Sequence, residues 1–243
     1  MTAIGIVGSE GRMGRAIAEA IAASAEAELA GGIDHDGDVS ALAGAADVLV
    51  DFSSPQALEA TLDACLAARA PILIGTTGLM ERHHYLIENA AKDIAVIQTG
   101  NTSLGVAMLA ALVRDAAGRL GEDWDIEILE MHHRHKVDAP SGTAKLLGEA
   151  AAEGRRVTLA EVTEEGRAGL TGARADGAIG FASLRGGSVA GDHRVIFAGP
   201  QERIELAHFA EDRAIFAKGA VRGALWLPGQ RPGRYDMSDV LGV

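Results

Sequence analysis

The chain has 243 residues, enough for one large or two small domains, and its 48% of hydrophobic residues is ordinary for a folded protein with a core. Acidic residues outnumber lysine and arginine by 34 to 22, and the resulting charge of −12 argues against a nucleic acid or an anionic membrane as a partner. The single cysteine, Cys65, excludes an internal disulfide and lies in an apolar run, where we expect it to be buried and inert. No apolar run reaches the length of a membrane span, so we expect a cytoplasmic protein.

The first hundred residues alternate short apolar stretches with amphipathic ones. Strands are predicted at 4–7, 28–33, 48–52, 71–75 and 94–98, and helices at 13–25, 55–68 and 80–91. Apolar strands that alternate with helices are typical of a parallel sheet buried on both faces. We therefore expect a Rossmann-like, doubly wound α/β domain over residues 1–103.

The pattern changes after residue 103. A long helix is predicted at 104–120, a strand at 124–131, a helix from Ser141, and extended stretches at 179–184, 188–197 and 203–209. Strands that follow one another without helices predict a second, α+β domain with a mostly antiparallel sheet, over residues 104–212.

Two further segments complete the chain. Residues 149–176 contain few large apolar residues, which indicates a mobile loop. A helix is predicted at 212–227 and an irregular tail from 231 onward, and we assign residues 213–243 to the first domain.

A glycine-rich loop follows the first predicted strand. Gly8, Gly11 and Gly14 stand where backbone N–H groups and the dipole of the next helix can bind a pyrophosphate. The spacing is Gly-x-x-Gly-x-x-Gly, with Glu10 in place of the usual second glycine, so its carboxylate should point away from phosphate. The alternative is a tight strand–helix turn without a ligand. We favour a dinucleotide site.

Asp34 ends the second predicted strand, twenty positions after Gly14. A carboxylate there would accept hydrogen bonds from the ribose hydroxyls of the cofactor, although a loop-capping aspartate is the alternative. No lysine or arginine occurs between Arg15 and Arg69, and only His35 could assist a ribose phosphate. The sequence therefore predicts a preference for NADH, with NADPH tolerated at best.

Two more strand ends carry small and hydrogen-bonding residues, in the segments 75–78 and 99–103. Ligands of open parallel sheets bind outside the carboxyl ends of the strands, so these segments suit the ribose and amide of a nicotinamide.

The most informative segment is His132–Lys136, in which three histidines, an arginine and a lysine fall in five positions of an acidic protein. Histidine titrates near neutrality and suits acid–base chemistry. Ser141 is a predicted N-cap after Pro140, and the N–H groups of the helix start that follows would bind a carboxylate. The segment thus predicts a site that holds and protonates a small anion.

Other interpretations of the histidines are less favoured. A solvated basic loop is one alternative for this segment, and a metal site of His132, His133 and His135 is another. The three lack the spacing and acidic partners of a zinc enzyme, so no metal is expected. His83 and His84 are predicted at the surface, and His193 and His208 in structural positions.

With these motifs in view, nearly the whole chain resembles the dihydrodipicolinate reductase family. The resemblance is carried by the segments 8–14, 51–53, 75–78, 100–103, 191–193 and 235–241, and most specifically by residues 130–144. It implies a reductase of the diaminopimelate route of lysine biosynthesis, which transfers a hydride from a nicotinamide to a cyclic dicarboxylate imine. The family is commonly a homotetramer formed through the central sheet.

The resemblance also implies roles for individual residues. His132 corresponds to the general acid/base and Lys136 to the proton donor. The substrate would be bound by His133, Lys136, Ser141, Gly142 and Thr143. The cofactor would be bound by Gly8, Ser9, Glu10, Gly11, Arg12, Met13, Asp34, Gly75, Thr76, Thr77, Thr99, Gly100, Asn101 and Thr102.

Two positions depart from the family pattern. Thr102 stands where many relatives have phenylalanine, so the nicotinamide pocket is expected to differ in shape. His35 replaces an arginine of dual-cofactor members, which favours NADH. Rival hypotheses are another two-domain dehydrogenase of a small anionic substrate and a nucleotide-sensing regulator without turnover.

Overall fold

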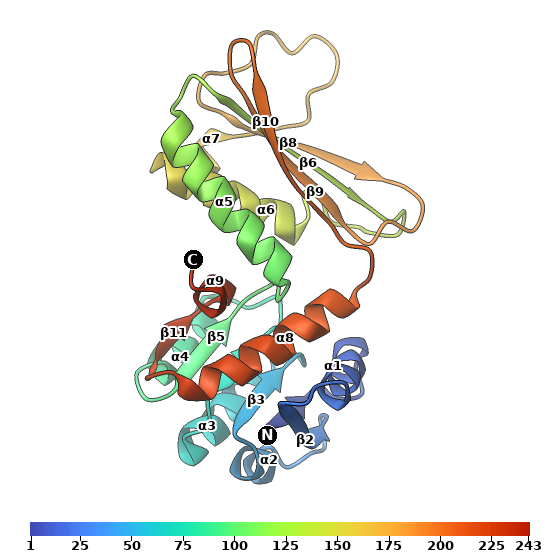
Figure 1. The fold of residues 1–243 in the computed structure, drawn as a ribbon, viewed down its shortest axis with the longest axis vertical. Coiled ribbons are helices and arrows are strands. Elements are labelled where there is room, and N and C mark those ends of the chain that lie inside the picture. The colour runs from blue at the N-terminus through green and yellow to red at the C-terminus, as the bar shows by residue number, and fades with distance from the viewer. The chain divides into compact units, whose positions relative to one another are not determined.

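A computed structural model describes residues 1–243, which divide into two compact units (Figure 1). The first unit comprises Met1–Leu104 and Ala214–Gly242, and the second comprises Gly105–Arg213 together with Val243. The first unit is therefore built from two separate stretches of the chain.

A six-stranded parallel sheet is the centre of the first unit. Its order is β11-β5-β4-β3-β1-β2, formed by β1 (Thr2–Val7), β2 (Ala27–Ile33), β3 (Val48–Asp51), β4 (Ile72–Ile74), β5 (Ala95–Gln98) and β11 (Gly233–Tyr235). The helices are α1 (Arg12–Ala22), α2 (Val39–Ala45), α3 (Leu58–Ala68), α4 (Glu81–Ala90), α8 (Ala214–Trp226) and α9 (Met237–Leu241), with a 3-10 turn at Leu227–Gly229. The predicted Rossmann-like domain is confirmed.

Helices cover this sheet because its inner strands are apolar on both faces. Every residue of β3 and β4 is buried. Residues of α2, α3 and α4 such as Leu42, Leu62 and Ile87 pack with Leu49 and Ile72 in one core cluster. Helix α8 contacts β3 and β4 and packs against α1. The chain passes from β1 to β2 on one side and to β3 on the other, so a topological switch point lies between β1 and β3.

Three elements of the first unit were not predicted. Helix α2 is short and rich in small residues, and it begins at Asp38, whose carboxylate accepts the N–H groups of Ser40 and Ala41 at 3.0 Å. Strand β11 and helix α9 replace the predicted irregular tail. Strand β11 has only three residues and depends on pairing with the distant β5, a contact that no local pattern reveals.

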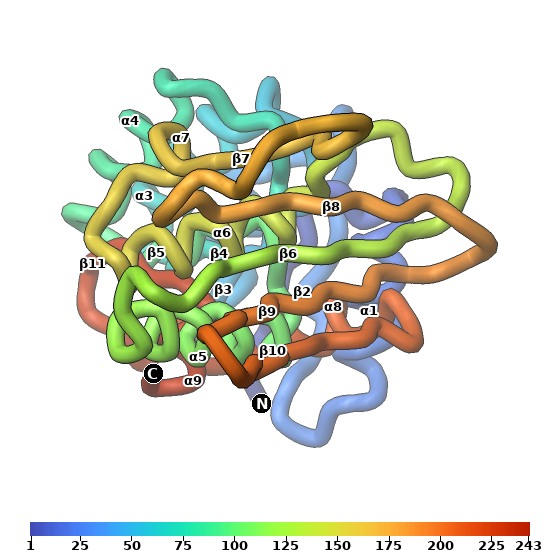
Figure 2. Tube along the Cα trace, turned by 90° about the horizontal axis from the view of Figure 1, so that it is seen from above, coloured from blue at the N-terminus to red at the C-terminus, as the bar shows by residue number.

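The second unit contains a five-stranded sheet in the order β10-β9-β6-β8-β7 (Figure 2). The strands are β6 (Asp125–His132), β7 (Thr163–Glu165), β8 (Ile179–Arg185), β9 (Asp192–Ala198) and β10 (Arg203–Phe209). The expected α+β unit is confirmed, but its sheet is mixed rather than mostly antiparallel. The β6/β8 and β7/β8 pairs are parallel, whereas β6/β9 and β9/β10 are antiparallel. The reason is that helices separate β6 from β8 in the chain.

The helices of the second unit are α5 (Leu104–Leu120), α6 (Gly142–Arg155) and α7 (Leu159–Val162). Alternate residues of β6, among them Ile126 and Ile128, are buried in a core cluster with Leu109 and Val113 of α5 and Leu147 of α6. These helices therefore pack against one face of the sheet.

The predicted loop over 149–176 is wrong for its first part, which forms the end of α6, then α7 and β7. Small residues suit this segment because α5 and α6 lie close together. A Cβ on Gly154 would fall 2.3 Å from the carbonyl oxygen of Arg114. Ion pairs hold the remaining residues, 166–176, against the sheet. Arg167 pairs with Glu127 and Glu164, and Arg174 pairs with Glu127 and Asp125.

Two buried side chains bear on the sequence predictions. Cys65 is fully buried as predicted, and burial raises the pKa of its thiol to about 12. His83, predicted at the surface, is only 2% exposed, and its Nδ1 accepts the N–H of Met80 at 2.8 Å. It shares the buried face of α4 with Ile87, one helical turn further on.

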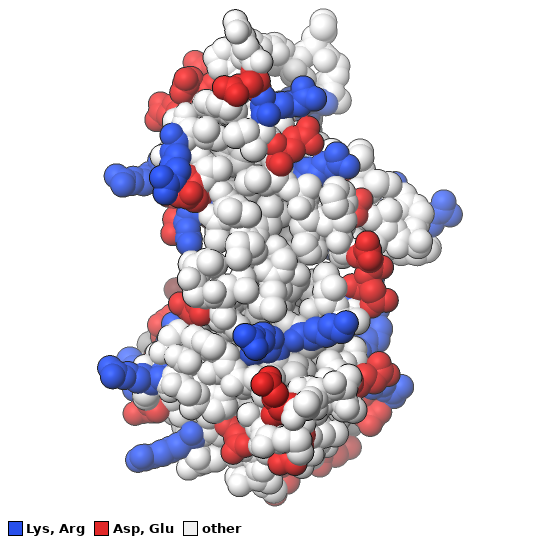
Figure 3. Space-filling view, viewed as in Figure 1, with Lys and Arg blue, Asp and Glu red and all other residues white.

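No helix of the structure combines the length and apolar character needed to cross a bilayer. Acidic and basic side chains are interspersed over the face shown in Figure 3, without a continuous basic surface.

Candidate active site

The glycine loop joins β1 to α1 in a close-packed conformation. The N–H groups of Gly8 and Ser9 donate to the carbonyl oxygen of Ile33 at 2.8 and 3.1 Å, which ties the loop to β2. Gly8 has φ of +85°, and a Cβ there would lie 2.8 Å from the carbonyl oxygen of Phe52. A Cβ on Gly14 would lie 2.2 Å from the carbonyl oxygen of Gly8. Both positions therefore require glycine.

The start of α1 has the features of an anion site. Its N-cap is Gly11, which contributes no side-chain cap to the first N–H groups. The neighbouring carboxylate of Glu10 pairs with Arg15 at 2.9 Å, and both side chains are about two-thirds or more exposed to solvent. Arg12 is exposed and Met13 is half-buried.

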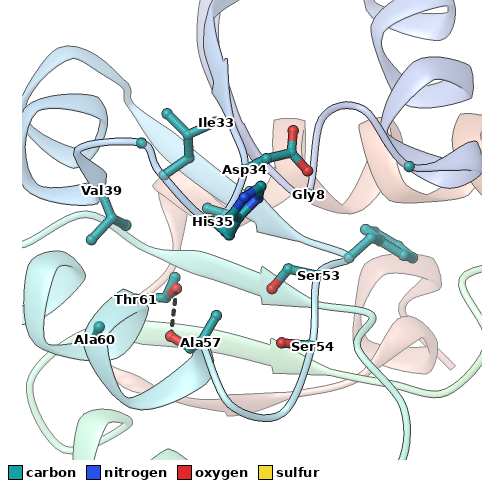
Figure 4. Close-up of a pocket in the computed structure, with 14 residues that line it drawn as sticks. Gly8, Ile33, Asp34, His35, Val39, Ser53, Ser54, Ala57, Ala60 and Thr61 are labelled. Carbon is teal, nitrogen blue, oxygen red and sulfur yellow. Dashed lines mark hydrogen bonds between the residues drawn. The ribbon is translucent and has the colours of Figure 1, made fainter.

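Asp34, which directly follows β2, is hydrogen bonded to the glycine loop. Its Oδ2 accepts the hydroxyl of Ser9 and the N–H of Glu10, each at 2.9 Å. Asp34 also lines a pocket of about 440 Å³ (Figure 4). In Figure 4, Asp34 and His35 lie on one side of this pocket, and Ser54, Ala57 and Thr61 lie on the other. The volume is within the range of about 300–1,000 Å³ that is usual for small-molecule sites.

The pocket lies where open parallel sheets bind their ligands, outside the carboxyl ends of the strands. Its lining includes Gly8 after β1, Ile33 at the end of β2, and Phe52 and Ser53 after β3. These are carboxyl ends of strands at the switch point between β1 and β3. Asp34 and the glycine loop are thus brought together, and Ser54, Ala57 and Thr61 are pocket residues that sequence reasoning missed.

Asp51 organises the loop that contains Gly75, Thr76 and Thr77. Its Oδ1 accepts the Thr76 hydroxyl at 2.9 Å, and the N–H and hydroxyl of Ser53 at 2.9 and 2.6 Å. Burial raises the pKa of this fully buried carboxyl, whose Oδ2 has no hydrogen-bond partner. A Cβ on Gly75 would collide with the Phe52 ring at 2.2 Å. Thr76 is therefore held in the interior, and Thr77 is exposed.

The segment from Thr99 to Thr102 is held by its own polar groups. The hydroxyl of Thr99 donates to the carbonyl of Asn101 at 2.8 Å, and Asn101 accepts the N–H of Ser103 at 2.9 Å. Thr102 is only 2% exposed, and its hydroxyl donates to the carbonyl of Phe216 in α8 at 2.7 Å. Gly100 is exposed. The hydroxyl of Thr102 is therefore hydrogen bonded to α8.

In the second unit, His132 ends β6 beside a buried carboxylate. Its Nδ1 lies 2.6 Å from Oε2 of Glu130, which is 1% exposed. Arg185 of β8 binds both oxygens of Glu130 at 2.7 and 2.8 Å, and the N–H of Ser141 donates to Oε1 at 3.2 Å. Burial raises the pKa of Glu130, but the hydrogen bonds from Arg185 and His132 outweigh it and lower the pKa to about 2. Glu130 is therefore ionised near neutral pH.

His193 of β9 is a second buried histidine at this site. Its ring meets that of His132 edge to face with 5.1 Å between centroids, and its Nε2 lies 3.0 Å from the Ser141 hydroxyl oxygen. Burial, reinforced by the nearby charge of His132, lowers the pKa of His193 to about 4. Ser141 is the N-cap of α6, as predicted, and accepts the N–H of Ala144. Sequence reasoning missed the contact of His193 with His132 and Ser141, although the segment 191–193 was part of the family pattern.

The loop after β6 carries the remaining candidates. Nζ of Lys136 lies 2.9 Å from Asp138, and Nε2 of His133 lies 3.1 Å from Nη2 of Arg213, which sequence reasoning did not single out. Desolvation, followed by the charge of Arg213, lowers the pKa of His133. His135 is exposed, and no three side chains of the metal-binding kind gather anywhere in the chain.

Gly142 and Thr143 begin α6, where the helix dipole is positive. The second unit thus brings together His132, His133, Lys136 and the start of α6. It adds Glu130, Arg185, His193 and Arg213.

The first unit has a parallel sheet with a glycine loop and a carboxylate, Asp34, at the end of β2. The second is a separate α+β unit that carries a histidine–lysine segment. These features define a two-domain oxidoreductase that uses a nicotinamide nucleotide. Family models narrow this class. The model described as "Dihydrodipicolinate reductase, N-terminus" matches residues 2–102, and the one described as "Dihydrodipicolinate reductase, C-terminus" matches residues 105–241. The chain belongs to the dihydrodipicolinate reductase family.

Curated relatives agree with this assignment. The chain is 58% identical to the 4-hydroxy-tetrahydrodipicolinate reductase of Zymomonas mobilis, over 99% of this chain and 97% of the relative. It is 52% identical to the enzyme of the same name from Parvibaculum lavamentivorans, over 98% and 97%. Among solved structures, the dipicolinate-bound dihydrodipicolinate reductase from Paenisporosarcina sp. TG-14 has the same fold, with a TM-score of 0.78, 23% identity and 97% of each chain covered.

Proposed function

We propose that the protein catalyses the reduction of 4-hydroxy-tetrahydrodipicolinate to tetrahydrodipicolinate, in the diaminopimelate route of lysine biosynthesis. The observation that carries this proposal is the cluster of His132, Lys136 and the start of α6, in a chain 58% identical to a relative with that name. The reaction removes one water and adds one hydride and one proton. Its protein side therefore needs groups that hold two carboxylates and exchange protons.

The residues of the first unit fit a nicotinamide dinucleotide. The start of α1, where Gly11 leaves the first N–H groups without a side-chain cap, suits a pyrophosphate, and the pocket beside Asp34 has the size and position for an adenosine. The segments at 75–77 and 99–102 would hold the nicotinamide end. When bound, the reduced nicotinamide supplies the hydride.

We propose that NADH is the preferred form and that NADPH is accepted less well. Asp34 presents a carboxylate to the pocket, and its lining contains no lysine or arginine. A ribose phosphate would meet the negative charge of Asp34 without a cation to offset it. His35 could offer only partial compensation, since it is exposed and lies 3.1 Å from Asp36.

The second unit would bind the dicarboxylate substrate. Lys136, His133 and Arg213 supply positive charge, and the N–H groups of Gly142 and Thr143 stand at the positive end of α6. His132 would exchange a proton as general acid/base, because an imidazole nitrogen can both gain and lose one, and Lys136 would donate a proton from its ammonium group. Ser141 sets the geometry through its cap of α6.

We also propose a homotetramer formed through the second sheet. Helices α5 and α6 pack on one face of this sheet. On its other face, the apolar side chains of Leu184 and Phe209 are 48% and 51% exposed. Exposed apolar surface of this kind is typical of subunit interfaces.

The test is the oxidation of NADH, followed by absorbance, with freshly prepared 4-hydroxy-tetrahydrodipicolinate. Turnover is expected with the purified protein and not with NADH alone. If no NADH is consumed at millimolar substrate although NADH binds, the proposal is wrong and a nucleotide-sensing role gains support.

A further inference from the structure

Glu130 is a buried carboxylate to which the proposed reaction assigns no role. It lies on the helix-covered face of β6, two residues before His132, with 1% of its surface exposed. Both of its oxygens are used: Oε2 meets Nδ1 of His132 and one nitrogen of Arg185, and Oε1 meets the other nitrogen of Arg185 and the N–H of Ser141. This is a fully satisfied network rather than a chance contact.

The pairing of strands produces this geometry. In the parallel pair β6/β8, His132 is in register with Arg185, and in the antiparallel pair β6/β9, Glu130 is in register with His193. Arg185 is itself fixed, because its guanidinium also donates to the carbonyl oxygens of Leu184 and Asp138, both at 2.6 Å. The carboxylate of Glu130 therefore cannot turn away from His132 without breaking several hydrogen bonds.

An ionised carboxylate can only accept hydrogen bonds, so the proton between Glu130 and His132 belongs to Nδ1 of the histidine. The neutral ring then has its lone pair at Nε2, which becomes the atom that gains and loses a proton. A bidentate arginine keeps the carboxylate charged, so Glu130 holds the ring without taking its proton. The buried aspartate of serine-protease triads orients its histidine in this manner.

Nε2 of His132 lies beside a glycine. A Cβ at Gly191 would lie 3.0 Å from Nε2 of His132, so glycine keeps this side of the ring clear. His193, the nearest histidine of β9, is neutral near pH 7 because burial lowers its pKa to about 4. The titratable and charged groups around His132 are thus Glu130 on its own strand, Arg185 on β8, His193 on β9, and His133 and Lys136 in the loop that follows.

We propose that Glu130, held by Arg185, is a positioning residue that fixes His132 as the Nδ1–H tautomer and directs Nε2 to the proton exchange of the reaction. This inference rests on the proposed function for the meaning of that exchange. The tautomer and its dependence on the two charges can be measured without turnover.

The first measurement is the ¹⁵N NMR spectrum of ring-labelled histidines in the wild-type protein, with His132 assigned from the spectrum of His132→Gln. The expected result is a neutral ring protonated at Nδ1. A ring protonated at Nε2 would overturn the proposal.

The second measurement compares two charge variants whose effects should be opposite. Glu130→Gln removes the negative neighbour, so the NMR titration of His132 should move to lower pH by about one unit or more. Arg185→Gln removes the positive neighbour and should move the same titration to higher pH. Shifts of opposite sign would show that both charges act on the ring of His132, and the tautomer measurement shows at which nitrogen its proton is held.

The matched control is Glu127→Gln, which removes a carboxylate from the same strand but from its other face, where Glu127 pairs with Arg167 and Arg174. It should leave the titration of His132 unchanged. If Glu130→Gln does not fold, the wild-type tautomer and Arg185→Gln decide the question. Titrations that do not move, or that move in the same direction, would overturn the proposal.

Kinetics separates this inference from the proposed function. If the wild type turns over the substrate, one limb of the pH dependence of kcat should report the ionisation of His132. In each variant this limb should shift in the same direction as the NMR titration of His132. If the wild type shows no turnover, the proposed function fails whatever the tautomer of His132. If it turns over and both variants keep the wild-type pH profile, the positioning role fails alone.

Discussion

Oδ2 of Asp34 lies 2.9 Å from the hydroxyl oxygen of Ser9. The same oxygen also accepts the N–H of Glu10, so a residue from the end of β2 braces the glycine loop. The other oxygen, Oδ1, remains available to a ribose. Asp34 can therefore brace the loop and still have the ribose-binding role that we propose for it.

Replacing Asp34 by alanine should weaken NADH binding by about tenfold to a hundredfold, because hydrogen bonds to a charged group contribute about 1.5–3 kcal/mol. NADPH should be affected less, since repulsion of its phosphate is relieved. Fluorescence titrations with both cofactors measure the ratio. Asp38→Ala, which removes the cap of α2, is the control and should not change this ratio. An unaltered ratio in Asp34→Ala would count against the ribose role.

His132→Ala and Lys136→Ala should each lower kcat by about 10²- to 10⁴-fold, the usual contribution of a proton-transfer group. The affinity for NADH should stay nearly the same, because neither residue belongs to the unit that carries the glycine loop. His135→Ala is the control, as that ring is exposed. Loss of NADH binding in either variant would show that the substrate site has been misplaced.

Substituting Gly191 by alanine should reduce kcat by about tenfold or more, since the new methyl group would press on Nε2 of His132 while Glu130 prevents the ring from moving. The unfolding temperature should also fall, because Gly191 has φ of +156°, a conformation that an L residue rarely adopts. Gly187→Ala is the matched control for backbone strain, because Gly187 also has a positive φ, of +52°, and its methyl group would meet nothing within 4 Å. Equal activity of both variants would contradict a restricted space at Nε2.

The stability of the fold should fall in mild acid because of His193. Its pKa is about 4 in the folded protein, against an ordinary value of 6.5, so the unfolded chain binds the proton more readily. The free energy of unfolding is then highest above pH 6.5 and declines as the pH falls towards 4. From those two values the loss between pH 7 and pH 5 is about 2 kcal/mol.

Urea unfolding of the wild type and of His193→Asn at these two pH values checks this expectation. The variant should be less stable at pH 7 but should lose about 2 kcal/mol less on acidification. His84→Asn, on the partly exposed side of α4, should behave like the wild type. Parallel pH dependence of wild type and His193→Asn would contradict the argument.

Local patterns predicted the elements that carry large apolar residues. The limits of Leu104–Leu120 and Arg203–Phe209 agree with prediction, and Ser141 is the N-cap expected from Pro140 and the glycine that follows. By contrast, Ala150, Ala151 and Ala152 suggested a loop, although small side chains are what the close approach of α6 to α5 requires. His83 could have been predicted correctly, because it stands four residues before the buried Ile87.

The candidate site was predictable where its residues are neighbours in the chain. His132, Lys136 and Ser141 fall within one segment, whereas Arg185 and His193 reach the site only through strand register. Glu130 lay within the conspicuous segment, but nothing local indicates that its carboxylate faces inward beside His132. The alternation of buried residues at 126, 128, 130 and 132 was the signal that could have been used.

The discontinuous first unit affects how the protein can form during synthesis. Strands β1 to β5 emerge from the ribosome early, yet helix α8, which packs on β3, β4 and α1, and edge strand β11 are translated last. Until then the part of the sheet that α8 covers, at β3 and β4, is bare, and the free edge of β5 is unpaired. The second unit, translated in between as a continuous stretch, can fold first, so a ribosome-bound intermediate should protect its amides from hydrogen exchange before those of β3 and β4.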